Sequence, residues 1–342
     1  MYTPTTYALN NNISLYFTDS GPPPSSTDYT TLVILHGTAF SGGKFLKFPI
    51  FIYYSEIDDL VNGRKVFLDN LGILLADFLR TFIEKEKIPE VDFQSKSGGL
   101  VILGWSAGNI TGMSMFTDPS LLDEKVYRLL ERYLREMVIY DPAYSVFGYP
   151  PPQVPGLYNP FFDPDFKGTP EEKFRNFAYW VASYYDHDSS RGPAGYDFRK
   201  LTDDNSLANW SEEDFNKYFC VDAAIRSEQT RGPAIQKTLR DCKDRVLFDA
   251  DIAAKLFPNM RVSYLSASRS VWFNFFAANE TERIFRDQIK TGQKENVGRW
   301  INFTVLEGAN HFLHQEDPER FMEIVKETLL LPALEDTRVV YV

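Results

Sequence analysis

The sequence is poor in cysteine, in positive charge and in long apolar runs. It has two cysteines, Cys220 and Cys242, among 342 residues, and neither stands in a metal-ligand spacing. A disulfide framework is thereby excluded, and a reduced compartment is favoured. No apolar run is long enough to cross a bilayer, and the first residues lack the basic and apolar regions of a secretory signal. We therefore expect a cytoplasmic protein without a membrane span.

Acidic residues outnumber basic ones and are spread along the chain. The formal net charge is −11, which argues against nucleic acid or an anionic membrane surface as the partner. Apolar residues, by contrast, make up 44% of the sequence and aromatic residues 15%. These amounts suffice for a large core and for additional rings that line a binding pocket.

Short apolar runs alternate with amphipathic segments, as in a parallel sheet covered by helices. The predicted strands are 12–18, 31–35, 99–103, 137–140, 260–265 and 301–306, and the predicted helices are 67–87, 121–136 and 317–330. Between them lies a Pro-rich and aromatic region with helical patterns and no convincing buried strand. The order predicts an α/β fold whose mostly parallel, doubly wound sheet is built by residues 1–142 and 259–342. Residues 143–258 would form an inserted helical lid.

The strongest chemical signal is Gly104-Trp105-Ser106-Ala107-Gly108, which directly follows the predicted strand 99–103. A serine held on a tight strand-to-helix turn projects its hydroxyl above the sheet. The flanking glycines are needed because side chains there would collide with neighbouring backbone. A bare G-x-S-x-G pattern often occurs by chance, but the strand–turn–helix context predicts that Ser106 is a nucleophile.

This GWSAGN elbow, the HGTAFSGG segment 36–43 and the YDPAYSVFGYP segment 140–150 resemble the α/β-hydrolase superfamily, in particular lid-bearing serine hydrolases of fungi. The resemblance covers nearly the whole chain and is weakest in the lid. It implies a structural role for His36 and Gly37. It also implies that the backbone N–H groups of Thr38 and Ala107 form an oxyanion hole.

A serine nucleophile needs a base, and the chain has four histidines. His311 follows the predicted strand 301–306, where the resemblance places the base. His314 is the second candidate. His36 lies upstream of the nucleophile, and His187 reads as a solvated polar residue at the end of a lid helix.

The acid is harder to assign, because no carboxylate stands at 264–272, where much of the superfamily has it. Ser266, Ser268 and Ser270 occupy that turn. A branch of the superfamily takes its acid from the end of the preceding strand, where this chain has Asp141. The order serine, aspartate, histidine is then the expected one. The alternative is that Asp141 only caps a turn.

A serine at the elbow favours acyl transfer. Epoxide hydrolases and haloalkane dehalogenases, which this chain resembles in the placement of the lid, need a carboxylate there instead. Trp105, Tyr149, Trp180 and Tyr184 would line an apolar pocket for a hydrophobic ester, unless they merely pack the lid onto the sheet. No metal or organic cofactor is implied.

The segment 44–66 is shorter than the helix and strand that such folds usually fit there. Residues 48–54 could supply the strand, but a missing strand would leave the elbow without a neighbour.

Two alternative functions therefore stay open. One is a non-catalytic binding protein, and the other is a serine-dependent lyase or C–C bond hydrolase.

Overall fold

The computed structural model describes residues 3–10, 13–24, 26–40, 54–225, 232–291, 297–331 and 339–342. Its centre is a six-stranded sheet in which spatial order follows sequence order and every neighbouring pair is parallel. The strands are β3 (Thr31–Leu35), β4 (Leu100–Trp105), β5 (Leu134–Tyr140), β6 (Arg261–Ala267), β7 (Ile301–Leu306) and β8 (Val339–Tyr341).

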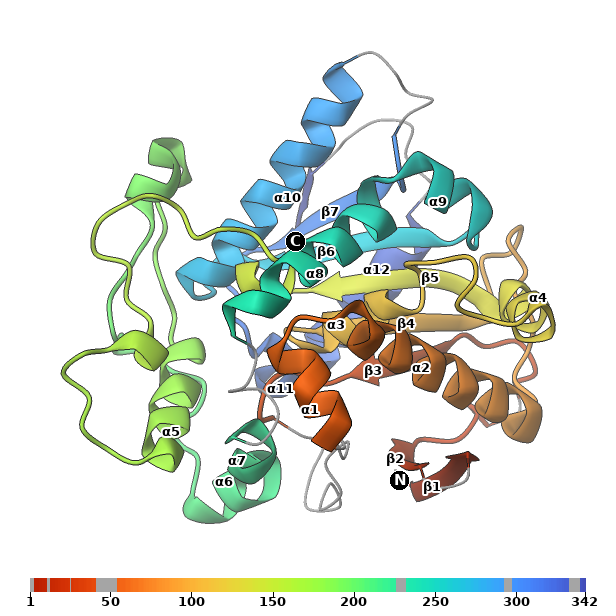
Figure 1. Cartoon of the computed structure of the whole chain (residues 1–342), viewed down its shortest axis with the longest axis horizontal. Helices are drawn as coiled ribbons and strands as arrows, with labels where there is room; N and C mark the ends of the chain where they lie inside the picture. The colour runs from red at the N-terminus through yellow and green to blue at the C-terminus, as the bar shows by residue number, and fades with distance from the viewer. Residues whose placement is uncertain are drawn as a thin grey trace.

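Helices cover both faces of this sheet. In Figure 1, α2 (Lys65–Glu86), α3 (Gly108–Ser114) and α10 (Trp272–Lys290) lie in front of the strands and α12 (Pro318–Leu330) lies behind them. Because both faces are covered, β4 and β5 are buried along their whole length, and LVILGW is a continuous apolar run. The predicted fold class, a parallel and doubly wound α/β sheet, is confirmed.

The residues between β5 and β6 that the structure describes form helices and no strand of a sheet. Figure 1 shows α5, α6 and α7 beyond the carboxyl ends of the strands. The elements are η1 (Tyr144–Val146), η2 (Pro160–Phe162), α5 (Pro170–Val181), η3 (Ser189–Gly195), α6 (Glu212–Tyr218), α7 (Val221–Ala223), α8 (Pro233–Lys243), the π-helical η5 (Asp244–Phe248) and α9 (Ala250–Lys255). None of the helices described is long and apolar enough to cross a membrane.

The boundary between α4 (Glu124–Tyr133) and β5 differs from the prediction. We expected a helix to residue 136, but the strand already begins at Leu134. The reason is that Arg135 and Glu136 are polar and yet buried. Arg135 donates to Thr30 Oγ1 and to a carbonyl of α12, and Glu136 pairs with groups of β6. Buried polar residues break the apolar pattern by which a strand is recognised.

The amino-terminal strand prediction holds, but its partner was missed. β2 (Ile13–Asp19) pairs antiparallel with β1 (Thr3–Asn10) in a separate two-stranded sheet. Rings of this hairpin pack on α2, as in the edge-to-face contact of Phe17 and Phe78 with centroids 5.2 Å apart.

The elbow strand β4 has a neighbour on each side. It pairs with β3 over Leu100–Gly104 and with β5 over Leu100–Trp105. The concern that a shortened segment would leave it without a neighbour is therefore wrong. Residues 44–53, which include most of the possible strand at 48–54, lie outside the described residues. Tyr54 begins α1 (Tyr54–Val61), which leads into α2.

Candidate functional site

Ser106 is held on a strained turn at the carboxyl end of β4. Its φ is 52°, in the left-handed region that residues other than glycine rarely adopt. The Ser106 N–H donates to the Tyr140 carbonyl at 2.9 Å. Asn109 donates to the Ser106 carbonyl from its backbone N at 3.2 Å and from Nδ2 at 2.9 Å. These bonds fix the turn and place the half-buried serine side chain above the sheet.

Three predicted glycines allow close contacts around this turn. A Cβ at Gly104 would lie 2.6 Å from Asn109 Oδ1, and one at Gly108 would lie 2.2 Å from the Leu35 carbonyl oxygen. A Cβ at Gly37 would lie 2.9 Å from Ser106 Cβ. The loop after β3 therefore passes directly beside the serine. His36, in the same loop, is exposed, and its Nδ1 lies 3.0 Å from the Gly37 carbonyl oxygen.

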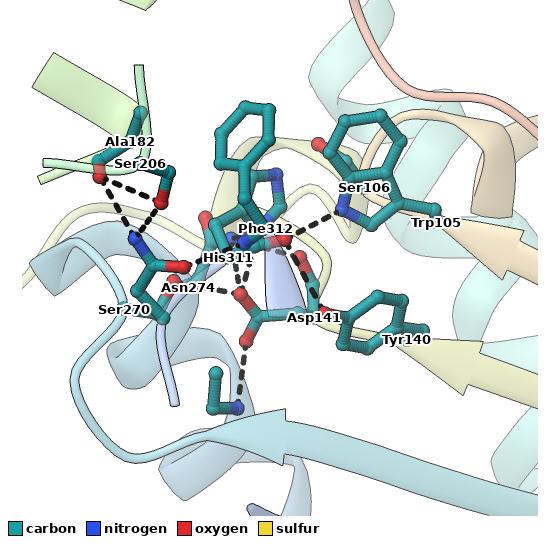
Figure 2. Close-up of polar contacts among 12 residues, drawn as sticks. Trp105, Ser106, Tyr140, Asp141, Ala182, Ser206, Ser270, Asn274, His311 and Phe312 are labelled. Atoms are coloured by element: carbon teal, nitrogen blue, oxygen red, sulfur yellow. Dashed lines mark hydrogen bonds and ion pairs between the residues drawn. The ribbon is translucent and has the colours of Figure 1, made fainter. Parts of the chain in front are cut away.

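Asp141 follows β5 and is buried completely, with four donors on its carboxylate (Figure 2). The His311 Nδ1 lies 2.7 Å from Oδ2, the Ser270 hydroxyl donates to Oδ2 at 2.6 Å, and Asn274 Nδ2 does so at 2.9 Å. The Ala267 N–H donates to Oδ1 at 3.2 Å. A buried charge is costly unless it is hydrogen-bonded, and this set of donors compensates for the burial.

His311 lies in the loop after β7, with its backbone and its ring both held. Its carbonyl accepts from Trp105 Nε1 at 3.1 Å and from the Tyr140 hydroxyl at 3.3 Å. Only 3% of its side chain is exposed. A proton on Nδ1 would be donated to the Asp141 carboxylate and would leave Nε2 as an acceptor.

Figure 2 shows Ser106 beside the cluster of Asp141 and His311. Within the described residues, no hydrogen bond joins Ser106 Oγ to the His311 ring. Such bonds are often long without substrate and tighten in the complex. Ala107 follows the serine at the start of α3, and its backbone N–H makes no hydrogen bond in the described part of the chain. Thr38 stands next to Gly37, close to the serine.

The candidate histidines His314 and His187 are both partly buried. Burial, with a contribution from nearby His311, lowers the pKa of His314 to about 3. Its ring lies against Trp105, with centroids 4.3 Å apart, and its Nδ1 has no partner in the described structure. The interpretation of His187 as a solvated residue is wrong. Its Nε2 lies 2.7 Å from the Ser270 carbonyl, its Nδ1 accepts from the backbone N–H of Asp197, and burial lowers its pKa.

Among the described residues, no hydrogen bond or ring contact joins the three predicted lid rings, Tyr149, Trp180 and Tyr184, to Ser106 or His311. The Tyr149 hydroxyl pairs with Thr281 Oγ1 at 3.0 Å, and Trp180 packs on Phe273 with centroids 4.8 Å apart. Tyr184 hydrogen-bonds Glu316 at the surface. Trp105 alone of the proposed substrate-binding set contacts the base, with its ring 5.0 Å from that of His311.

Sequence reasoning missed the polar residues that support this site. Asn109 fixes the turn, and Ser270 and Asn274 bond the Asp141 carboxylate. The available signal was an asparagine inside the aromatic run WFNFF, because a polar residue on an apolar helix face needs a buried partner. For metals, the part of the chain that the structure describes holds no group of three or more suitable ligands, and both cysteines are unpaired.

No protein-family model and no curated protein sequence matches the chain. Three solved structures are similar at low identity. Epoxide hydrolase A from Mycobacterium thermoresistibile is 12% identical, with a TM-score of 0.43 over 96% of this chain and 98% of that one. An E-2-(acetamidomethylene)succinate hydrolase is 13% identical, with a TM-score of 0.39 over 96% and 99%. The carboxylesterase CesB from Bacillus subtilis is 12% identical, with a TM-score of 0.38 over 96% and 92%.

The fold is identified from the molecule itself. A parallel sheet carries a serine on a strand-to-helix elbow after β4, an aspartate after β5 and a histidine after β7, in that chain order. This is the arrangement of the α/β-hydrolase fold. The resemblance to lid-bearing serine hydrolases of fungi stays a prediction.

Proposed function

We propose that this protein is a serine hydrolase that cleaves a carboxylic ester of a hydrophobic small molecule through an acyl-enzyme. One observation carries the proposal: the buried Asp141 carboxylate lies 2.7 Å from His311 Nδ1, beside a serine held at positive φ. A base oriented by an acid next to the hydroxyl of an elbow serine is the arrangement that activates a serine.

In the proposed reaction, Ser106 Oγ attacks the ester carbonyl carbon while His311 Nε2 takes the hydroxyl proton. The negative charge on the carbonyl oxygen is stabilised by the backbone N–H groups of Ala107 and Thr38. The bond to the alcohol oxygen then breaks, and His311 returns the proton to that oxygen. Water, deprotonated by the same imidazole, attacks the acyl carbon and releases the acid and the serine.

Asp141 would act through His311. Its negative charge stabilises the imidazolium that forms when the proton is transferred, and its hydrogen bond keeps Nδ1 protonated. Because the carboxylate is held by donors from β6 and α10, it needs no rearrangement during the reaction.

A hydrophobic substrate is supported by rings that gather near the elbow. Phe40 packs on Trp105, Phe219 and Phe312 with centroid distances of 5.9, 5.0 and 4.8 Å. These rings come from the loop after β3, the elbow, the inserted helices and the base loop. They would form an apolar wall for an acyl or alcohol group.

We also propose that residues 143–258 act as a lid over this site. The segment contacts both loops that border the serine: the Cys220 N–H donates to the Ala39 carbonyl at 2.7 Å, and Asn310 Nδ2 donates to the Ala182 carbonyl at 2.8 Å. A cytoplasmic location fits the unpaired state of both cysteines.

A second candidate function is that of a binding protein which keeps the fold without turnover. It is favoured by the near-complete burial of His311 and by the lack of a hydrogen bond from Ser106 Oγ to His311 among the described residues. A fluorophosphonate probe distinguishes the two functions. The hydrolase requires labelling of the wild type and none of Ser106→Ala, whereas a folded wild type that stays unlabelled would support the binding protein. A panel of short and long p-nitrophenyl esters then separates an esterase from a lyase or C–C bond hydrolase.

A further inference from the structure

Two fully buried side chains outside the proposed triad contact its acid. Ser270 donates from Oγ to Asp141 Oδ2 at 2.6 Å. Asn274 donates from Nδ2 to the same Oδ2 at 2.9 Å and to the Asp141 backbone carbonyl at 2.8 Å. Ser270 lies in the turn after β6, and Asn274 lies in the first turn of α10. Asp141, at the end of β5, is therefore held by the segment that follows the neighbouring strand β6 (Figure 2).

Neither orientation of the Asn274 amide satisfies all of its atoms, because in the present one Oδ1 is buried and has no hydrogen-bond partner within the described residues. The reverse orientation is worse. If its amide were turned over, Oδ1 would face two acceptor oxygens of Asp141, which repel it. With Nδ2 in that place, both amide hydrogens are used by Asp141. Asn274 Nδ2 also lies 2.8 Å from His311 Nδ1, so the amide lies against the acid and the base together.

Two neighbours act on the protonation of His311 Nδ1 in opposite directions. Asn274 Nδ2, at 2.8 Å, would donate to an unprotonated Nδ1, whereas the Asp141 carboxylate requires a protonated one; the charged carboxylate is the stronger of the two. An Nδ1 without a proton would face the Asp141 carboxylate as one acceptor against another at 2.7 Å. A protonated Nδ1 donates to Oδ2 and leaves Nε2 to accept the serine proton. Ser270 is itself held in place, because the His187 Nε2–H donates to its carbonyl at 2.7 Å.

We propose that Ser270 and Asn274 are positioning residues that fix Asp141 in the orientation in which it directs the His311 base. This rests on the proposed hydrolase function. Without these donors the buried carboxylate would lose the bonds that hold Oδ2 toward Nδ1, and the imidazole would lose its fixed tautomer.

The test compares Ser270→Ala and Asn274→Asp with matched controls from the same elements. Ser268→Ala removes a hydroxyl from the same turn that accepts from the Gly308 N–H, and Asn279→Asp changes an asparagine of α10 that donates to Tyr196. The rate of labelling by a fluorophosphonate is measured against pH. We expect a loss of about 10-fold for Ser270→Ala, because one bond to a charged group is removed, and of about 100-fold for Asn274→Asp, because a donor is replaced by a second carboxylate that repels Asp141.

Both variants should also move the acidic limb of the pH–rate profile, whereas the controls should match the wild type in rate and profile. A melting curve confirms that each variant is folded. A second readout does not need activity: in the Ser106→Ala background, the far-downfield proton resonance of a histidine Nδ1–H bound to a carboxylate should shift or vanish in Ser270→Ala and Asn274→Asp.

The outcomes separate the two claims. If the wild type labels and both variants label at its rate with an unchanged resonance, the positioning role is wrong and the hydrolase stands. If the wild type does not label but the resonance responds as expected, the hydrolase function fails and the positioning of His311 through Asp141 stands.

Discussion

Replacing Asp141 with asparagine removes one negative charge and almost no volume, so it isolates the role of that charge. Three donors surround Oδ2 and one donor faces Oδ1. The new amide should therefore place its oxygen at the Oδ2 position and its NH₂ toward the Ala267 N–H. The folded state then loses about one hydrogen bond, roughly 1–3 kcal/mol of unfolding free energy. The His311 Nδ1–H still finds an acceptor.

The cost to catalysis should be much larger than the cost to stability. The imidazolium formed on proton transfer would lose its buried counter-charge, and turnover should fall by about 10⁴. That factor corresponds to about 5.4 kcal/mol of transition-state stabilisation. Turnover of p-nitrophenyl butyrate and urea unfolding of the same samples give the two quantities.

A variant that turns over within about tenfold of the wild type would show that Asp141 is not the acid. The double variant Asp141→Asn with Ser268→Asp is the matched control, because Ser268 contacts Gly308 and not His311. It should not regain activity. Recovery in that variant would show that a carboxylate at position 268 can serve His311 and would refute the reasoning that this position does not reach the base.

Three further predictions concern stability and the base loop. Gly108→Ala places a Cβ 2.2 Å from a backbone oxygen and should lower the free energy of unfolding by roughly 3 kcal/mol. Gly112→Ala in the same helix has its nearest neighbours at 3.5 Å and should change this free energy by under about 1 kcal/mol. Urea titrations measure both. His314 binds protons more weakly in the folded chain than in the unfolded one, so stability falls as pH drops below about 6.5. The free energy of unfolding of the wild type falls between about pH 7 and pH 5, and His314→Phe should make this fall smaller by roughly 1–2 kcal/mol. Melting curves at the two pH values measure the difference. Asn310→Ala removes the bonds to Ala182 and Ser206 and should cost about 2 kcal/mol and lower turnover; unchanged melting and turnover would show that this anchor is dispensable.

The parts of the fold that could be predicted are those with a local signal. β3 and β7 coincide with their apolar runs, and the elbow lies where a glycine pattern follows a buried strand. The start of β5 could not be predicted, because Arg135 and Glu136 are buried by partners far away in the sequence.

The same reason limits what the sequence reveals about the site. Asp141 was recognisable by its place after a strand, but the donors on it were not. Asn274 lies among aromatic residues on α10, and nothing in its neighbourhood along the chain shows that it bonds Asp141. His187 looked solvated because its partners, Asp197 and Ser270, meet it only in the folded chain. Side-chain pairing across long sequence separations has no periodic signature.

Asp141 is also the point at which the chain leaves the sheet for the inserted helices, and the chain returns to the sheet at Arg261, the first residue of β6. Only the first attachment point adjoins the hydrogen-bond network on the Asp141 carboxylate. Arg261 pairs in register with Glu136 near the start of β5, whereas Ala267 and Ser270, which hold the carboxylate, lie at and beyond the carboxyl end of β6. This gives a rule for building chimaeras. An exchange of the insertion with junctions after residue 142 and before residue 261 would keep the four bonds to the Asp141 carboxylate, although it would remove the bond from His187 to the Ser270 carbonyl. A junction inside β5 or in the turn at 267–270 would divide the network.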